Sequence, residues 1–220
     1  MVILVRHGTT ATTGRELPGR APGLDLADQG RAEARVAAAR IAAFTGRRNG
    51  NSTGRDGKQP PPPVLYASPL ERTQQTAAPI AEALGCKVLT DDGLLEVDIG
   101  EWTGMELKAA QKRKEWAAIQ RYPSSFRFPG GESFVDLQAR MVSTLDRFRT
   151  THPGHTVVAV SHADPIRVAV AQALGTHLDL FQRIAISPCS LTVVAYGADG
   201  PMVLTVNSTA DGRESGPTPS

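Results

Sequence analysis

Side chains suited to phosphoryl chemistry follow four apolar runs that lie far apart in the sequence. The candidates are Arg6 and His7 after the first run, Arg72 beyond the second, Glu96 beyond the third and His162 after the fourth. In an open sheet of parallel strands, ligands bind outside the carboxyl ends of the strands, which meet at one edge. The sequence therefore predicts that these side chains form one site.

The residue types in this set indicate how such a site would work. The guanidinium groups of Arg6 and Arg72 are permanently charged, planar donors that match phosphoryl oxygens, although a carboxylate would also fit them. A neutral imidazole is a competent nucleophile at phosphorus, and cationic neighbours lower its pKa. His7 is therefore the candidate nucleophile.

His162 and Glu96 could supply the remaining functions, which are stabilisation of the transferring oxygens and proton transfer. His162 could stabilise the transferring oxygens, because phosphoryl transfer needs charge dispersed over the equatorial oxygens. Glu96 could protonate the leaving alkoxide and, once ionised, activate the attacking water. A histidine at a strand end is more often structural than catalytic, so the convergence of the whole set is what favours chemistry.

The order of predicted elements places this set in an α/β fold. Strands are predicted at 2–5, 64–67, 87–90 and 156–161, helices at 26–44, 69–84, 104–121, 133–151 and 164–174, and a closing hairpin at 191–196 and 202–206. Strands that alternate with helices in this way build a buried, mostly parallel sheet. We expect a single-domain three-layer α/β/α sandwich with a helical lid insertion.

Domain bounds follow from where this pattern starts and stops. Residues 1–207 are predicted to form one catalytic domain, in which residues 101–135 are the lid region. Two segments have compositions that bury too little apolar surface to order themselves. They are the Pro/Gly-rich loop at 45–63, predicted to be flexible, and the tail at 208–220, predicted to be disordered.

Composition limits the classes of partner. The 220 residues are 40% hydrophobic and carry 24 basic and 22 acidic side chains, a net charge of +2 that is too weak to favour nucleic acid or a membrane surface. No run approaches the roughly 20 apolar residues of a membrane span. Cys86 and Cys189 lack metal-ligand spacing. We expect a cytoplasmic protein.

Five blocks of sequence resemble the histidine phosphatase superfamily, in its phosphoglycerate-mutase-like branch. In the family's order they are LVRHGTT at 4–10, SPLERTQQTA at 68–77, LE at 95–96 with GEWTG at 100–104, PGGES at 129–133, and SH at 161–162. The resemblance spans roughly residues 2–206 and implies a metal-independent enzyme without a cofactor, and we expect its substrate to be a small phosphorylated metabolite. It implies that a phosphohistidine forms on His7, that Arg6, Arg72 and His162 hold the phosphoryl group, and that Glu96 is the acid and then the base.

The resemblance also points to substrate contacts and to departures from the family pattern. Ala163, directly after His162, is expected at the substrate, and so is Thr13, which stands where many members carry Asn. The Thr13 hydroxyl could replace that amide. Thr9 occupies a position that is often acidic in relatives. Ala27 replaces the Thr that usually begins the first helix, which should weaken helix capping rather than catalysis.

Several other features have two interpretations. Trp102 could wall the pocket or pack in the interior. The segment 130–133 starts a helix and borders the substrate in the family. Asp164 and Arg167 are spaced as a pair across one helical turn, with a substrate role as the alternative. The basic residues Lys108, Lys112, Arg113 and Lys114 could hold a second acidic group or form the solvated face of a lid helix.

The acceptor of the phosphoryl group decides the function. Water gives a phosphatase, and a retained substrate oxygen gives a mutase. Mutases of this branch carry a longer excursion between the acid and the second histidine, whereas 66 positions (162 minus 96) separate Glu96 from His162 here. This compact lid favours hydrolysis. A non-catalytic phosphate-binding protein is a third hypothesis. The substrate and the oligomeric state, including a homodimer, stay open at the level of sequence.

Overall fold

Successive side chains of the apolar strands point to opposite faces of the sheet and so divide the interior into two layers. The computed structural model of the chain describes residues 1–46 and 61–210. In strand β1 (Val2–Arg6), Ile3 and Val5 face one apolar cluster, whereas Val2 and Leu4 face another. A strand whose successive side chains point to opposite faces and are all buried must be covered on both sides.

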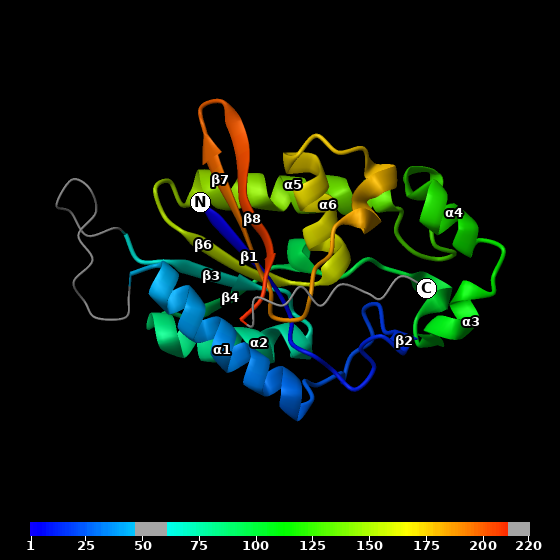
Figure 1. Cartoon of the computed structure of the whole chain (residues 1–220), viewed down its shortest axis with the longest axis horizontal. Coiled ribbons are helices and arrows are strands. Elements are labelled where there is room, and N and C mark those ends of the chain that lie inside the picture. Colours follow the sequence, from blue (N-terminus) through cyan, green and yellow to red (C-terminus); the bar gives the residue numbers. More distant parts are fainter. Residues whose placement is uncertain (47–60, 211–220) are drawn as a thin grey trace.

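Helices cover the two faces in pairs, as Figure 1 shows. Helices α1 (Asp28–Phe44) and α2 (Glu71–Leu84) pack on one face, and α5 (Phe134–Thr151) and α6 (Ala163–Ala173) pack on the other. The sheet between them has the order β4-β3-β6-β1-β7-β8. The predicted three-layer α/β/α architecture is therefore confirmed.

The sheet is parallel in its main part and antiparallel at one side. Strands β3 (Val64–Ala67), β4 (Val88–Thr90) and β6 (Val157–Ser161) run parallel to β1. Strand β7 (Leu191–Gly197) runs antiparallel to β1, and β8 (Gly200–Ser208) runs antiparallel to β7. The predicted closing hairpin is confirmed, and its second strand is longer than expected.

The lid differs from the single helix predicted at 104–121. Strand β5 (Met105–Glu106) pairs with β2 (Glu16–Leu17), and two short helices follow, α3 (Leu107–Gln111) and α4 (Trp116–Arg121). The break covers the four consecutive charged residues 112–115, which offer no apolar side chain to hold a continuous helix against the interior. The prediction of one helix was wrong at this point.

Short 3-10 helices connect the main elements. They are η1 (Asp92–Leu94), η2 (Gly100–Trp102), η3 (Pro123–Ser125) and η4 (Leu178–Arg183). Two of them, η1 and η2, flank the segment that carries Glu96.

The two segments predicted to lack order fall mostly outside the described residues. Positions 47–60 of the 45–63 loop and positions 211–220 of the tail lie there. Ser208, the first residue of the predicted tail, is instead the last residue of β8, and its carbonyl oxygen accepts a hydrogen bond from Arg40 at 2.9 Å. The domain bounds 1–207 stay a prediction.

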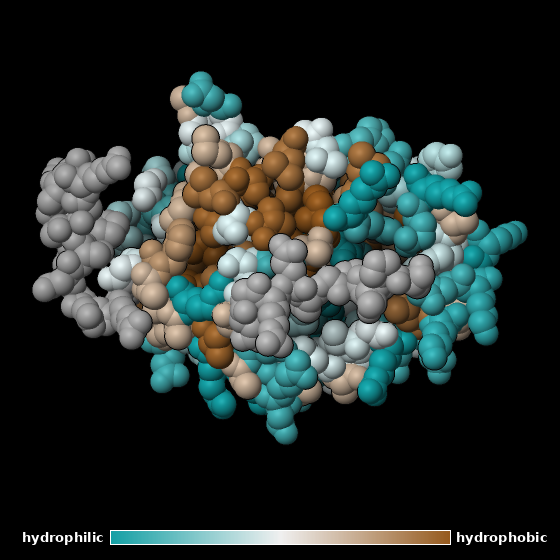
Figure 2. All heavy atoms as spheres, viewed as in Figure 1, coloured by the Kyte–Doolittle hydropathy of each residue, from teal (hydrophilic) through white to brown (hydrophobic). Residues whose placement is uncertain are grey.

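One face of the molecule carries exposed apolar side chains near the edge strand β8. Leu174, Met202 and Leu204 are each more than half exposed, at 55%, 65% and 52%. Figure 2 shows apolar residues gathered over α6 and the β7–β8 hairpin. The homodimer stays a prediction. No helix within residues 1–46 and 61–210 is both long and apolar enough to span a membrane.

Helix α1 starts without a side-chain cap, as the sequence predicts. Ala27 is its N-cap residue and makes no side-chain hydrogen bond, whereas Ser133 and Asp136 form a complete capping box on α5. We expect Ala27→Ser to raise the free energy of unfolding by about 1 kcal/mol, because the hydroxyl would accept from an unpaired N–H of the first turn. Urea denaturation measures the change.

The capping box on α5 provides the matched control for this substitution. Ser133→Ala should lower the free energy of unfolding by about 1 kcal/mol. An unchanged urea midpoint for Ala27→Ser, beside a lowered one for Ser133→Ala, would contradict the capping explanation for α1.

Candidate active site

Parallel pairing of β1 with β6 brings the two candidate histidines together. Arg6 lies opposite Ser161 in the register, and the backbone N–H of His7 donates to the Ser161 carbonyl at 2.9 Å. The rings of His7 and His162 follow the two strand ends, with centroids 5.2 Å apart and planes at 61°. The paired strands therefore bring these two residues side by side, as their positions after apolar runs predict.

Hydrogen bonding assigns the tautomer of His7. Its Nδ1 lies 2.8 Å from the Gly8 carbonyl oxygen, which can only accept, so Nδ1 carries the proton and Nε2 keeps a lone pair. Burial, followed by the charges of Arg6 and Arg72, lowers the pKa of His7 to about 3. His7 is therefore a neutral imidazole at physiological pH, with Nε2 as its nucleophilic atom.

The backbone after His7 is held by both helices of the layer beneath it. A Cβ on Gly8 would lie 2.5 Å from the carbonyl oxygen of Gly30 in α1, so only glycine allows this approach. The Gly8 N–H donates to the Thr76 hydroxyl at 3.0 Å, and that hydroxyl donates to the Arg72 carbonyl at 2.7 Å. Thr76 thus ties the His7 loop to the turn of α2 that carries Arg72.

Buried nitrogens without partners belong to His162 and to the two arginines whose charges act on His7. Arg6 donates one hydrogen bond to the Ile186 carbonyl at 2.7 Å. Arg72 donates one to the Gly19 carbonyl at 2.8 Å. The buried side-chain nitrogens that lack a partner within the described residues include Arg6 Nε, Arg72 Nε, Arg72 Nη1 and His162 Nδ1.

These unpaired donors indicate what the site binds. Leaving a buried donor unsatisfied costs about 1–3 kcal/mol, and more for a charged group. An oxyanion seated beside His7 would satisfy the donors of Arg6 and Arg72 together, because a guanidinium presents a planar fork to phosphoryl oxygens. The arrangement therefore fits a phosphoryl group next to a nucleophilic nitrogen.

His162 lies completely buried with one ring nitrogen occupied. Its Nε2 lies 2.9 Å from the Ser68 hydroxyl, and its Nδ1 has no partner within the described residues. Burial and then the charges of His7, Arg72, Arg6 and Arg140 lower the pKa of His162 well below 6.5. The ring is thus neutral in the unliganded site, and Ser68 orients it.

The charges of Arg6 and Arg72 both act on the carboxyl group of Glu96. Part of the residue stays exposed, yet the surrounding protein desolvates its carboxyl group and raises the pKa of Glu96 to about 7. The negative charge of Asp164 acts in the same direction. A hydrogen bond from the Val97 N–H and the two guanidinium charges oppose the shift. Near neutral pH this carboxyl group can therefore both give and take a proton.

The two weaker candidates lie beside this set. Ala163 is the first residue of α6, next to His162 at the N-cap position. Thr13 has its hydroxyl occupied by Thr10, whose N–H donates to it at 2.9 Å and whose hydroxyl lies 3.0 Å away. Thr13 thus holds a turn, and substrate contact by either candidate stays a prediction.

The residues of the lid and α6 that have two interpretations make structural contacts, and a substrate role for them stays untested. Trp102 is 1% exposed and packs edge-to-face on Phe126 and Phe128, so it belongs to the interior. Asp164 and Arg167 form the expected pair at 2.9 Å. The lid residues Lys108, Lys112, Arg113 and Lys114 are exposed, and the Arg113 guanidinium lies 5.0 Å from the centroid of the Trp102 ring.

Reasoning from residue types missed several residues around the site. Ser68 and Thr76 lie in the 68–77 block that carries the family resemblance, which was the available signal. Arg20 and Arg140 act on backbone carbonyls near Glu96, and no pattern in the sequence marks such contacts.

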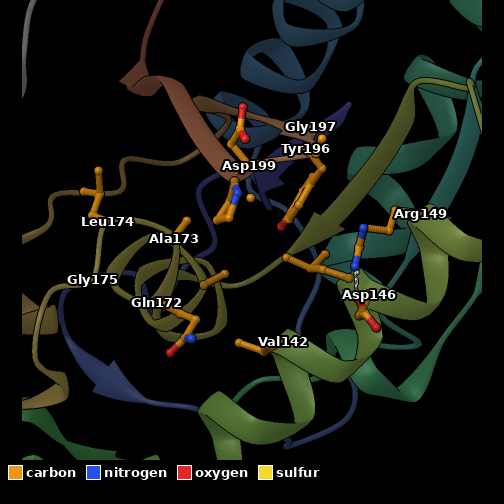
Figure 3. A pocket seen from close by; sticks show the side chains of 15 residues that line it. Val142, Asp146, Arg149, Gln172, Ala173, Leu174, Gly175, Tyr196, Gly197 and Asp199 are labelled. Atoms are coloured by element: carbon orange, nitrogen blue, oxygen red, sulfur yellow. Dashed lines mark hydrogen bonds and ion pairs between the residues drawn. The ribbon is translucent and has the colours of Figure 1, made fainter.

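A separate groove lies far from His7 in the fold. It has a volume of about 680 Å³ and lies between α5, the C-terminal half of α6 and the β7–β8 hairpin, where Asp146 pairs with Arg149 (Figure 3). None of the predicted site residues lines it. Because His162 is the N-cap residue of α6 and this groove adjoins the C-terminal end of that helix, the groove is not part of the candidate site.

Neither a cluster of metal ligands nor a disulfide occurs among the described residues. Over residues 1–46 and 61–210, no group of three or more His, Cys, Asp or Glu side chains is arranged to hold a metal ion. Cys86 and Cys189, both described, do not form a disulfide.

The chain is similar to known proteins over most of its length. A family model described as the histidine phosphatase superfamily (branch 1) matches residues 2–209. Phosphoserine phosphatase 1 of Hydrogenobacter thermophilus is 33% identical over 156 residues, 66% of this chain and 70% of that protein. The protein named "Probable phosphoglycerate mutase GpmB" of Yersinia enterocolitica is 30% identical over 198 residues, 89% of this chain and 84% of that protein.

Two further similar proteins are a longer relative and a solved structure. "Bifunctional protein Rv2228c" of Mycobacterium tuberculosis is 33% identical over 202 residues, 90% of this chain but 51% of that protein, so the chain spans about half its length. A solved phosphoserine phosphatase mutant from Entamoeba histolytica, in complex with phosphoserine, has a TM-score of 0.80 at 20% identity, with 95% of this chain and 97% of that chain covered. This likeness shows a shared fold.

The raised pKa of Glu96 makes stability depend on pH. A carboxyl group whose folded pKa of about 7 exceeds its ordinary value of 4.5 stabilises the fold at low pH, and this contribution is lost as pH rises through 7. Glu96→Gln cannot ionise. We expect its urea midpoint, relative to wild type, to be higher at pH 8 than at pH 5.

Glu101→Gln, at an exposed position in the same loop region, serves as the matched control. Its midpoint relative to wild type should be equal at the two pH values. If the Glu96→Gln difference were also equal at pH 5 and pH 8, the pKa of Glu96 would not be raised.

Proposed function

The chain belongs to the histidine phosphatase superfamily, and on that premise we propose that it hydrolyses phosphomonoesters of small metabolites through a phosphohistidine on His7. The observation that carries this proposal is the set of unpaired donors on Arg6 and Arg72 around a neutral imidazole whose Nε2 holds a lone pair. A nucleophile and an oxyanion site in contact are the parts that phosphoryl transfer needs.

In the first half-reaction, Nε2 of His7 attacks the phosphorus atom. An N–P bond forms and the P–O bond to the alcohol breaks, while Arg6 and Arg72 neutralise the equatorial oxygens. The departing alkoxide takes a proton from the Glu96 carboxyl group, which the raised pKa keeps partly protonated at neutral pH. The products are the free alcohol and a phosphohistidine.

In the second half-reaction, the Glu96 carboxylate takes a proton from water as the water oxygen attacks phosphorus. The N–P bond breaks and its electron pair returns to Nε2 of His7. Inorganic phosphate leaves and Glu96 is protonated again, ready for the next turnover. In this proposal the guanidinium groups supply the positive charge, and no step is routed through a metal.

Small phosphorylated metabolites are the substrate class that we propose. A curated relative is named as a phosphoserine phosphatase, and the short span from Glu96 to His162 leaves a compact lid rather than an open surface. A phosphomutase is the second candidate, because the chain is 30% identical to the protein named "Probable phosphoglycerate mutase GpmB". We also propose a cytoplasmic location.

The covalent step predicts a specific trapped species. Rapid acid-free quenching of the wild type with ³²P-labelled substrate should give a phosphoprotein that is labile to acid and stable to base, as expected for a phosphoimidazole. His7→Ala should retain less than about 1% of the hydrolysis of p-nitrophenyl phosphate. Thr76→Ser, which keeps the hydroxyl under the His7 loop, is the matched control and should form the labelled species.

Two outcomes would count against this mechanism. Label retained in His7→Ala would place the nucleophile elsewhere. Absence of turnover in the wild type, together with tight binding of inorganic phosphate, would instead favour the non-catalytic phosphate-binding protein.

The acceptor of the phosphoryl group is tested separately. With 3-phosphoglycerate as substrate, we expect phosphate release to be faster than formation of 2-phosphoglycerate. ³¹P NMR distinguishes the two products in one sample. Interconversion that outpaced phosphate release would assign the chain as a mutase.

A further inference from the structure

Arg140 reaches from α5 to the backbone of residues 93–98, here called the Glu96 segment. Its Nη1 donates to the carbonyl oxygens of Gly93 and Leu95 at 2.8 and 3.0 Å, and its Nη2 lies 3.4 Å from the carbonyl oxygen of Glu96. One guanidinium therefore holds three carbonyl groups of the segment from one side. Such a fork of donors in fixed geometry is a property of arginine that lysine lacks.

Glu132 joins Arg140 to a second guanidinium on the same segment. Its carboxylate accepts from Nε and Nη2 of Arg140, both at 2.9 Å, and from Nη2 of Arg20 at 3.1 Å. The Nε of Arg20 donates to the Glu96 carbonyl at 2.8 Å. With its side chain only 13% exposed, Glu132 bridges two cations that both reach the Glu96 backbone.

The backbone of Glu132 is also joined to the Glu96 segment. Its N–H donates to the Asp98 carbonyl at 2.8 Å, and its carboxylate accepts from the Asp98 N–H at 3.3 Å. A Cβ on Gly131 would lie 2.4 Å from the Asp98 carbonyl oxygen, so the two loops touch backbone to backbone. This contact leaves no room for the segment to shift toward the lid.

The Glu96 carboxyl group itself has few constraints of its own. Within the part of the chain that the structure describes, its hydrogen bond is to the N–H of the next residue, Val97, at 3.0 Å. The position of the carboxyl group therefore depends on where the backbone of the segment is held. A catalytic group displaced by about 1 Å can lose as much as a hundredfold in rate.

We propose that Arg20, Glu132 and Arg140 are positioning residues that set the Glu96 carboxyl group against the oxygen of the leaving alcohol. The inference rests on the proposed function and deepens it. It also gives Glu132, in the segment expected to border the substrate, a role that needs no substrate contact.

Two substrates whose leaving groups differ in basicity can distinguish a misplaced acid from a general loss of stability. Only the substrate with the more basic leaving group depends strongly on the acid. A phenolate ion leaves poorly without a proton, whereas a p-nitrophenolate ion leaves without one, and the two esters differ only by the nitro group. General acid catalysis typically contributes about 10²–10⁴-fold. The parameter kcat/KM for each ester covers the steps up to departure of the alcohol, so water attack does not enter the comparison.

We expect Arg140→Lys and Glu132→Gln to lower kcat/KM for phenyl phosphate about tenfold and for p-nitrophenyl phosphate about twofold. Arg149→Lys, which changes an exposed ion pair on the same helix, should leave both values unchanged. In a Glu96→Gln background, Arg140→Lys should lower kcat/KM for either ester less than about twofold, because the group that it positions is absent.

The same experiment separates failure of the inference from failure of the proposed function. Equal losses for both esters in Arg140→Lys and Glu132→Gln, or a loss that is undiminished in the Glu96→Gln background, would overturn the positioning role. If Arg140→Lys failed to fold, Glu132→Gln and Arg20→Lys carry the comparison. If Glu96→Gln itself lowered kcat/KM equally for both esters, the acid assignment in the proposed function would be wrong.

Discussion

The parallel pairing of β1 with β6 is the contact on which the rest of the site depends. It sets Arg6 opposite Ser161, so that His7 and His162 leave the sheet side by side although they lie far apart in the sequence. A shift of one residue in this register would turn every side chain of β1 to the opposite layer. Because both faces of β1 are buried, the apolar clusters on each side oppose such a shift. The packing of the interior thereby maintains the geometry of the site.

The site concentrates positive charge where water is largely excluded. The guanidinium groups of Arg6 and Arg72 lie beside two imidazoles, and burial keeps both rings neutral, so the cations do not repel a protonated histidine. Glu96 supplies a counter-charge that is only partly ionised near neutral pH, since its pKa is raised. Unpaired donors and a half-protonated carboxyl group are unfavourable for folding alone. In the proposed reaction the donors would bind the phosphoryl oxygens and the carboxyl group would transfer a proton.

Local patterns predicted most of the fold and which residues it brings together in the candidate site. The apolar runs that form β1 and β6 are buried on both faces. Because ligands bind at the carboxyl ends of such strands, the ends of these runs indicated Arg6, His7 and His162. The lid was harder to predict, because the charged run 112–115 interrupts a helical pattern whose ends still look amphipathic. The contacts of Arg140 with backbone carbonyls were inaccessible from sequence, since any carbonyl can accept a hydrogen bond and only the fold decides which ones come within reach.

The hydrogen bond from His7 to the Gly8 carbonyl has a regiochemical consequence. Because Nδ1 donates to Gly8, the two nitrogens of this ring are not interchangeable. In the proposed reaction, phosphorus can become bonded only to Nε2, so one regioisomer of phosphohistidine forms, the tele isomer. That isomer keeps the Nδ1 proton and its hydrogen bond throughout the cycle. The imidazole therefore need not rotate or exchange tautomers between turnovers, and the same lone pair that attacks is regenerated when phosphate leaves.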